Sequence, residues 1–113
     1  LSAEAKLPSQ AEIDKRDAAM IEEGRKLVVD FGCIDCHKFH DEGSLGIAPD
    51  LTGYASREWT AGIVRNPADK RFYDKNNDRM PAYAPPEENP ADHLLSEHQI
   101  KLLANWLLGI WPE

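Results

Sequence analysis

Apolar residues recur at helical spacing in three stretches of the chain. The first stretch begins at Ala11 and ends at Gly32, with apolar positions that mostly fall on one helical face: Ile13, Met20, Ile21, Leu27 and Val28. The second begins at Ser56, a good N-cap residue, and ends before Pro67, because proline disfavours helical geometry in the residue before it. Its predicted buried side carries Trp59, Ile63 and Val64.

The third stretch has the best-defined start. Ser96 is an N-cap, Gln99 completes a capping box, and Leu95 with Ile100 forms a hydrophobic staple. Its apolar stripe contains Ile100, Leu103, Ala104, Leu107 and Ile110. Glycines and prolines punctuate the segments between the three helices, and no segment shows sustained strand alternation. The pattern predicts an all-α fold with long ordered loops, which need something to pack on.

Length and composition indicate one soluble domain. The chain has 113 residues, of which 42% are hydrophobic and 29% charged, and no apolar run approaches the length of about 20 residues that spans a bilayer. We expect residues 1–16 to be a polar linker or N-terminal extension and residues 17–113 to form the domain. The chain lacks an initiator Met, so excision from a longer, membrane-tethered protein and a free shuttle both stay open.

The charge of the chain argues against nucleic acid as a partner. The formal net charge is -7, whereas binding to phosphates requires a basic surface. Only residues 57–80 are net positive, with 6 basic and 4 acidic side chains. Both a solvated face of mixed charge and a docking role fit that stretch.

The motif Cys33-Ile34-Asp35-Cys36-His37 carries the candidate chemistry. Two thiols three residues apart on one turn can form thioether bonds with the two vinyl groups of a porphyrin, and the following imidazole can ligate its iron. The motif therefore predicts covalently bound haem c, held by Cys33 and Cys36, with His37 as the proximal iron ligand.

Two other interpretations of the same cysteines remain. A thioredoxin-like redox pair would need a strand before the motif, whereas this one follows a predicted helix. A zinc site would combine Cys33 and Cys36 with two of the four histidines, His37, His40, His93 and His98, but no recognisable second half of such a site is present.

A sixth iron ligand would separate electron transfer from chemistry on small molecules. Met20 lies on the first predicted helix, where methionine is usually core filler. Met80 lies in a polar stretch and is followed by the rigid Pro81. We predict that Met80 is the distal ligand. The rival is a haem-based sensor or enzyme domain with a labile Met80 that binds a diatomic gas or peroxide.

From about Gly24 to Ile110 the sequence resembles the class I c-type cytochromes. Gly24 and Val28 are similar to the small-and-large pair on the first helix of that family. The resemblance implies that this helix crosses the last helix against Trp106. Residues 47–53 resemble the loop whose proline carbonyl, here that of Pro49, accepts a hydrogen bond from the proximal imidazole.

The resemblance implies a cytochrome c fold: an all-α domain of three to five helices with long loops wrapped around one covalently bound haem. The expected haem-binding residues beyond the ligands are Pro49, Leu51, Tyr54, Trp59, Ile63 and Tyr83. The implied role is electron transfer rather than catalysis, in a bacterial respiratory chain on the periplasmic side. Expected partners are a redox donor and acceptor, such as a quinol-oxidising cytochrome b complex or a terminal oxidase.

Overall fold

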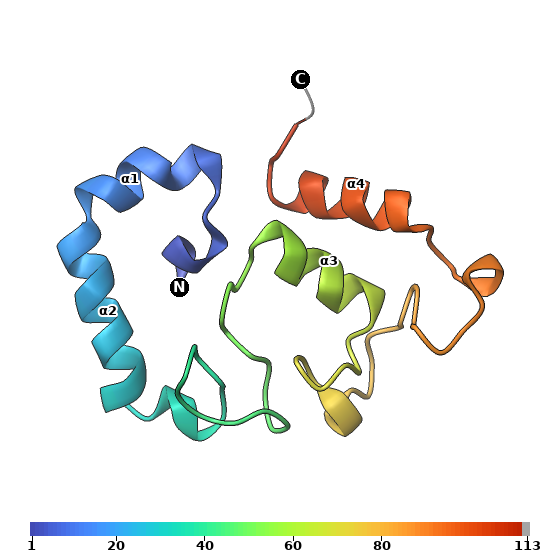
Figure 1. The fold of residues 1–113 in the computed structure, drawn as a ribbon, viewed down its shortest axis with the longest axis horizontal. Helices are drawn as coiled ribbons and strands as arrows, with labels where there is room; N and C mark the ends of the chain where they lie inside the picture. The colour runs from blue at the N-terminus through green and yellow to red at the C-terminus, as the bar shows by residue number, and fades with distance from the viewer. Residues whose placement is uncertain (112–113) are drawn as a thin grey trace.

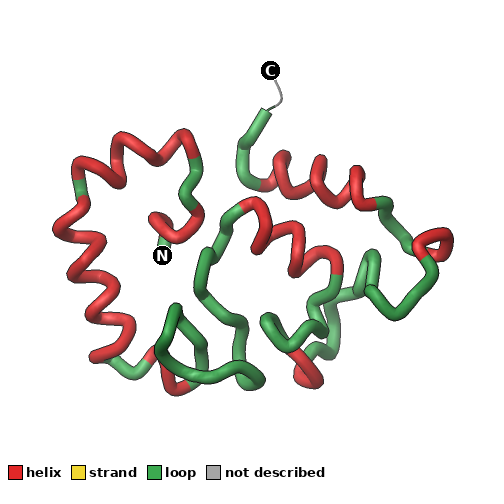
Figure 2. The backbone as a smooth tube through the Cα atoms, viewed as in Figure 1, coloured by secondary structure: helices red, strands yellow, loops and turns green. Residues whose placement is uncertain are grey.

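The computed structural model describes residues 1–111, where helices are joined by long loops and no strand is present (Figure 2). The elements lie in a flat arrangement of 47 × 39 × 20 Å (Figure 1). Its α-helices are α1 (Ala11–Arg16), α2 (Ala18–Asp30), α3 (Arg57–Arg65) and α4 (Glu97–Leu107). Short 3-10 turns are η1 (Ser2–Ala5), η2 (Pro8–Gln10), η3 (Cys33–Asp35), η4 (Asp74–Asn76) and η5 (Pro90–Asp92). The all-α prediction is confirmed.

The helices α3 and α4 begin where the sequence predicts. The Ser56 hydroxyl accepts a hydrogen bond from the Trp59 backbone N–H at 3.1 Å. At α4 the Ser96 hydroxyl accepts from the Gln99 N–H at 3.2 Å, and the Gln99 side chain accepts from the Ser96 N–H at 2.7 Å. This capping box satisfies donors that the first helical turn leaves unpaired.

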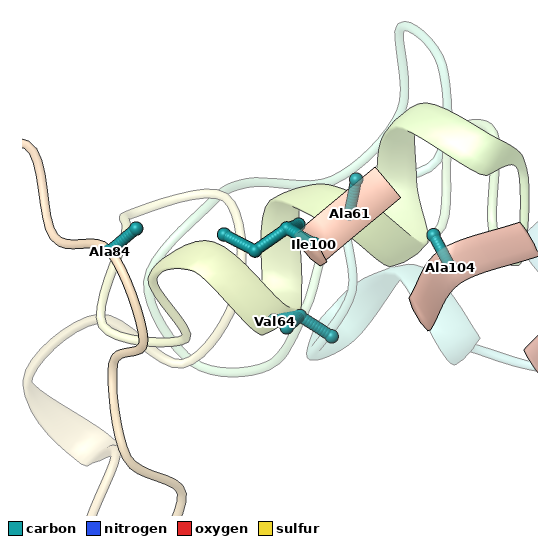
Figure 3. Close-up of a cluster of buried hydrophobic side chains, with 5 residues drawn as sticks. All are labelled: Ala61, Val64, Ala84, Ile100 and Ala104. Carbon is teal, nitrogen blue, oxygen red and sulfur yellow. The ribbon is translucent and has the colours of Figure 1, made fainter. Parts of the chain in front are cut away.

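The hydrophobic core lies where α3 packs against α4 (Figure 3). Ile100 of α4 is fully buried in a cluster of otherwise small side chains: Ala61, Val64, Ala84 and Ala104. Met80 and Tyr83 pack against the edge of this cluster. Backbone bonds from the Tyr83 and Ala84 N–H groups to carbonyls at the end of α3 hold that segment in place. The segment around Met80 is therefore fixed to the α3–α4 pair.

The first predicted helix is interrupted, so the expectation of one continuous helix is wrong. Asp17, with φ -98° and ψ 21°, separates α1 from α2. The Asp17 carboxylate accepts two hydrogen bonds from the Arg16 guanidinium, at 2.8 and 2.9 Å. Aspartate has a lower helix propensity than alanine or arginine, its neighbours here.

The expected crossing of the first and last helices is not present, because α2 lies apart from α4 (Figure 1). Trp106 is 62% exposed, and Leu107, predicted to be buried, is also exposed. Gly24 and Val28 instead line a cavity of about 240 Å³ with η1 and Phe39. The N-terminal segment, residues 1–16, thus faces the side of α2 that the family resemblance assigned to α4.

Candidate functional site

Cys33 begins η3 and Cys36 directly follows it, shortly after the end of α2. Gly32, at φ +76°, turns the chain out of the helix. Within the turn the His37 N–H donates to the Cys33 carbonyl at 3.0 Å, which brings the histidine back over the first cysteine. Both thiols are free and exposed. The motif follows a helix, whereas a thioredoxin-like redox pair follows a strand.

His37 forms the shortest contact of the site. Its Nδ1 lies 2.6 Å from the carbonyl oxygen of Pro49. A carbonyl can only accept a hydrogen bond, so Nδ1 carries the proton and donates it. In the neutral ring this leaves the Nε2 lone pair for a metal, and the hydrogen bond fixes the orientation of the ring. The bond that the family resemblance implied between Pro49 and His37 is present.

The loop that contains Pro49 is fastened on both sides. The Leu51 N–H donates to the Lys38 carbonyl at 2.8 Å, which ties the loop to the segment after His37. The Asp50 N–H donates to the Arg71 carbonyl at 2.8 Å, and the Trp59 indole Nε1–H donates to the Asp50 carbonyl at 2.8 Å. Pro49 is thereby held between the motif and α3.

Aromatic side chains pack beneath this loop. Trp59 is 8% exposed, and its ring meets those of Tyr54 and Phe72 edge-on at centroid distances of 4.9 and 5.3 Å. Of the predicted pocket residues, Leu51, Tyr54 and Trp59 are therefore brought together beside Pro49. Ile63 is half-buried on α3, and Tyr83 packs with the α3–α4 core instead.

Met80 lies in the segment after η4, half-buried against the α3–α4 core. The Asn77 side chain donates to its carbonyl at 3.0 Å, and the Asn76 side chain donates to the Gly46 carbonyl at 3.0 Å. These bonds attach the Met80 segment to the start of the loop that carries Pro49. Met80 packs against the α3–α4 core and His37 is bonded to Pro49, so their pairing on iron stays a prediction.

Two features of the site escaped the sequence analysis. Gly43 has φ +77°, and a methyl group there would overlap the carbonyl oxygen of His37. Its identity as a glycine in a turn was the only hint. The second feature is Glu4, which is 7% exposed and hydrogen-bonded to His40 and to the Gly53 N–H. A lone acidic residue in a polar leader gave no hint of such burial.

The histidines outside the motif contact other parts of the chain or face solvent. His93 Nε2 donates to the Pro85 carbonyl at 3.1 Å, and His98 is exposed on α4. Within residues 1–111 no three side chains among His, Cys, Asp and Glu gather as a metal site. The ligand set considered for zinc is therefore not assembled in this part of the chain.

The family model described as Cytochrome c matches residues 21–111. The chain belongs to the cytochrome c family. Searches of curated proteins and of solved structures returned no match. The match covers the motif, the Pro49 loop, Met80 and both core helices, and it begins after the N-terminal segment.

Membership of the cytochrome c family establishes the cofactor and its general role. Cytochromes c carry covalently bound haem c and transfer electrons between redox partners. The residues present fit haem c: two exposed thiols flank one turn, and the adjacent imidazole has its Nδ1 proton bonded and Nε2 left for the iron. Among the described helices of this cytochrome c, none is long and apolar enough to cross a membrane.

Proposed function

We propose that this cytochrome c carries a single haem, attached through Cys33 and Cys36, with His37 and Met80 as axial ligands. In this role the protein passes one electron at a time and makes or breaks no substrate bond. Bound haem supplies the iron that changes oxidation state. The protein supplies the ligands, their orientation and the surrounding dielectric.

The observation that carries the proposal is the 2.6 Å hydrogen bond from His37 Nδ1 to the Pro49 carbonyl. Histidines that bind metals commonly donate their other ring N–H to a carbonyl or carboxylate. The carbonyl holds the ring orientation and increases the basicity of the nitrogen that binds iron.

The surroundings of Met80 support a ligand role for its sulfur. The Asn77 side chain holds the Met80 carbonyl, the Asn76 side chain ties the segment to Gly46, and Pro81 restricts the chain directly after Met80. A thioether ligand favours reduced iron and thus raises the reduction potential. Six-coordinate iron also rearranges little on electron exchange, which suits a carrier.

The pocket is proposed to include Pro49, Leu51, Tyr54, Trp59, Ile63 and Tyr83. The first four of these lie along one connected stretch of loop and helix beside His37, which supports them most strongly. Burial of a cofactor against such apolar and aromatic side chains excludes water and adjusts its potential. Ile63 and Tyr83 are included because they lie on α3 and beside the α3–α4 core.

We place this cytochrome c in a bacterial respiratory chain, on the periplasmic side of the membrane. A quinol-oxidising cytochrome b complex as donor and a terminal oxidase as acceptor fit the proposed role. Docking between such carriers is transient and depends on salt. The net-positive stretch of residues 57–80, in a chain of net charge -7, offers a basic region for an acidic partner.

The test is to express the chain in a host that attaches haem c and to analyse the purified protein. We expect a red protein whose mass exceeds that of the polypeptide by one haem, which denaturation does not remove. The double variant Cys33→Ser and Cys36→Ser should lose its haem on denaturation. A colourless protein that binds zinc would overturn the proposal.

Carbon monoxide separates a closed carrier from a gas- or peroxide-binding domain. The reduced protein should not bind carbon monoxide at neutral pH, because Met80 occupies the site that the gas would need. Ready binding would instead assign a sensor or enzyme role with a labile methionine.

A further inference from the structure

The N-terminal segment, which precedes the family match, is bound to the functional site through one buried carboxylate. Glu4 on η1 is 7% exposed. Its Oε1 accepts a hydrogen bond from His40 Nε2 at 2.9 Å, and its Oε2 accepts one from the Gly53 N–H at 2.9 Å. Arg25 of α2 lies 3.9 Å from Oε1. Both carboxylate oxygens are thus used, each by a different part of the chain.

The electrostatics of Glu4 keep it ionised. Burial alone would raise the pKa of its carboxyl group, but the hydrogen bonds from His40 and Gly53 and the charges of His40 and Arg25 outweigh burial and hold the pKa below its ordinary value. A buried carboxylate is costly unless it is paired and hydrogen-bonded. Glu4 has hydrogen-bond donors in His40 and Gly53 and a positive charge nearby in Arg25.

Each hydrogen-bond partner of Glu4 lies a few residues after one member of the His37–Pro49 contact. His40 lies three residues after His37, and Gly53 lies four residues after Pro49. Between them, the His40 N–H donates to the Thr52 hydroxyl at 2.7 Å. The segment after the motif and the loop after Pro49 therefore run side by side, and Glu4 joins them from outside.

We propose that Glu4 is a positioning residue for His37. Its carboxylate holds residues 37–40 against residues 49–53, and this clamp keeps the Pro49 carbonyl on His37 Nδ1. This inference rests on the proposed ligation of the haem iron by His37. A firm Nδ1–H···O bond places more negative charge on the ring and so favours oxidised iron. Loosening the clamp should therefore raise the reduction potential.

The variant that tests the clamp is Glu4→Gln in the haem-loaded protein. The amide has the shape of the carboxylate but turns a donor toward one of two donors, so one of the two segments loses its partner. Glu12→Gln is the matched control, because it removes the same charge from a side chain that is exposed on α1. Glu4→Asp keeps the charge but is one methylene shorter, so it should reach only one partner and give an intermediate result.

Two measurements report on the contact between His37 and Pro49, and Glu4→Asp, which keeps the negative charge, separates loss of the contact from loss of charge. In Glu4→Gln we expect the His37 ring N–H and the Leu51 amide to exchange with solvent at least about tenfold faster than in the parent protein. We also expect a higher reduction potential, while Glu12→Gln leaves both unchanged. If Glu4→Gln only lowers the melting temperature and moves neither quantity, Glu4 merely anchors the terminus and the inference is wrong.

Failure of the ligation is distinguishable from failure of the clamp. Absence of His37 ligation in the parent protein, seen in its haem spectrum, overturns the proposed function and with it the effect on potential. Unchanged exchange at Leu51 in Glu4→Gln overturns the clamp, whatever the ligand is.

Discussion

Replacing Trp59 by phenylalanine should weaken the loop that holds His37. The substitution keeps an aromatic ring between Tyr54 and Phe72 but removes the indole N–H that donates to the Asp50 carbonyl at 2.8 Å. That carbonyl directly follows Pro49 in the chain and lies in a buried hydrogen bond. In the variant it would lose its partner without gaining access to water.

The cost follows from two terms. Leaving a buried carbonyl without a donor costs about 1–3 kcal/mol. The smaller ring also leaves unfilled volume at a side chain that is only 8% exposed, which adds about 1 kcal/mol. A total of about 2–4 kcal/mol is a large part of the roughly 5–15 kcal/mol that stabilises a domain. For a chain of this length the melting temperature should fall by about 8–15 °C.

Urea and thermal unfolding of the haem-loaded variant, followed by circular dichroism, measure this loss. Trp106→Phe is the matched control, because the same change is made at a side chain that is 62% exposed on α4. The control should lose no more than about 0.5 kcal/mol. Equal losses in the two variants would refute the assignment of Trp59 as the support of the Pro49 loop.

Three further outcomes are expected. Gly43→Ala forces a side chain into a backbone at φ +77° and against the His37 carbonyl, so it should cost at least about 2 kcal/mol in urea unfolding; a loss below about 0.5 kcal/mol would contradict the geometry. Ser96→Ala removes the hydroxyl of the capping box and should lower stability by about 1 kcal/mol, whereas an unchanged melting temperature would show that the cap is not needed. The pKa of Glu4 is lowered on folding, so its contribution to stability is complete above the ordinary value of 4.5 and is lost as the pH falls through the folded pKa. The difference in stability between the parent protein and Glu4→Gln should therefore narrow on acidification. A difference that is constant with pH would count against the ionised carboxylate.

Local hydrogen bonding and periodicity explain which parts of the fold were predictable. The starts of α3 and α4 depend on side chains within three residues of each other, so Ser56 and the pair Ser96 and Gln99 specify them in the sequence alone. The burial of Ile100 follows from its place in an apolar stripe.

The errors concern contacts between segments distant in sequence. Whether Trp106 meets Gly24 depends on how several loops orient α2, and no local pattern encodes that orientation. The break falls at Asp17, a residue of lower helix propensity than its neighbours, but the difference is under about 1 kcal/mol and does not by itself predict a break.

The candidate site divides in the same way. The motif from Cys33 to His37 is a contiguous run, so its chemistry was apparent from spacing. The link from Pro49 to His37 came from the family resemblance and is present in the structure. Glu4 meets His40 across 36 positions of sequence, a contact that only the folded chain creates.

The axial ligand is tested most directly by the absorption spectrum of the oxidised haem-loaded protein, in which a sulfur-to-iron bond gives a weak long-wavelength band. The parent protein and Met20→Ala should both show the band, because Met20 is an exposed residue of α2. Met80→Ala should lose it and bind carbon monoxide when reduced. A band that persists in Met80→Ala, or is missing from the parent protein, would contradict the His37 and Met80 ligation.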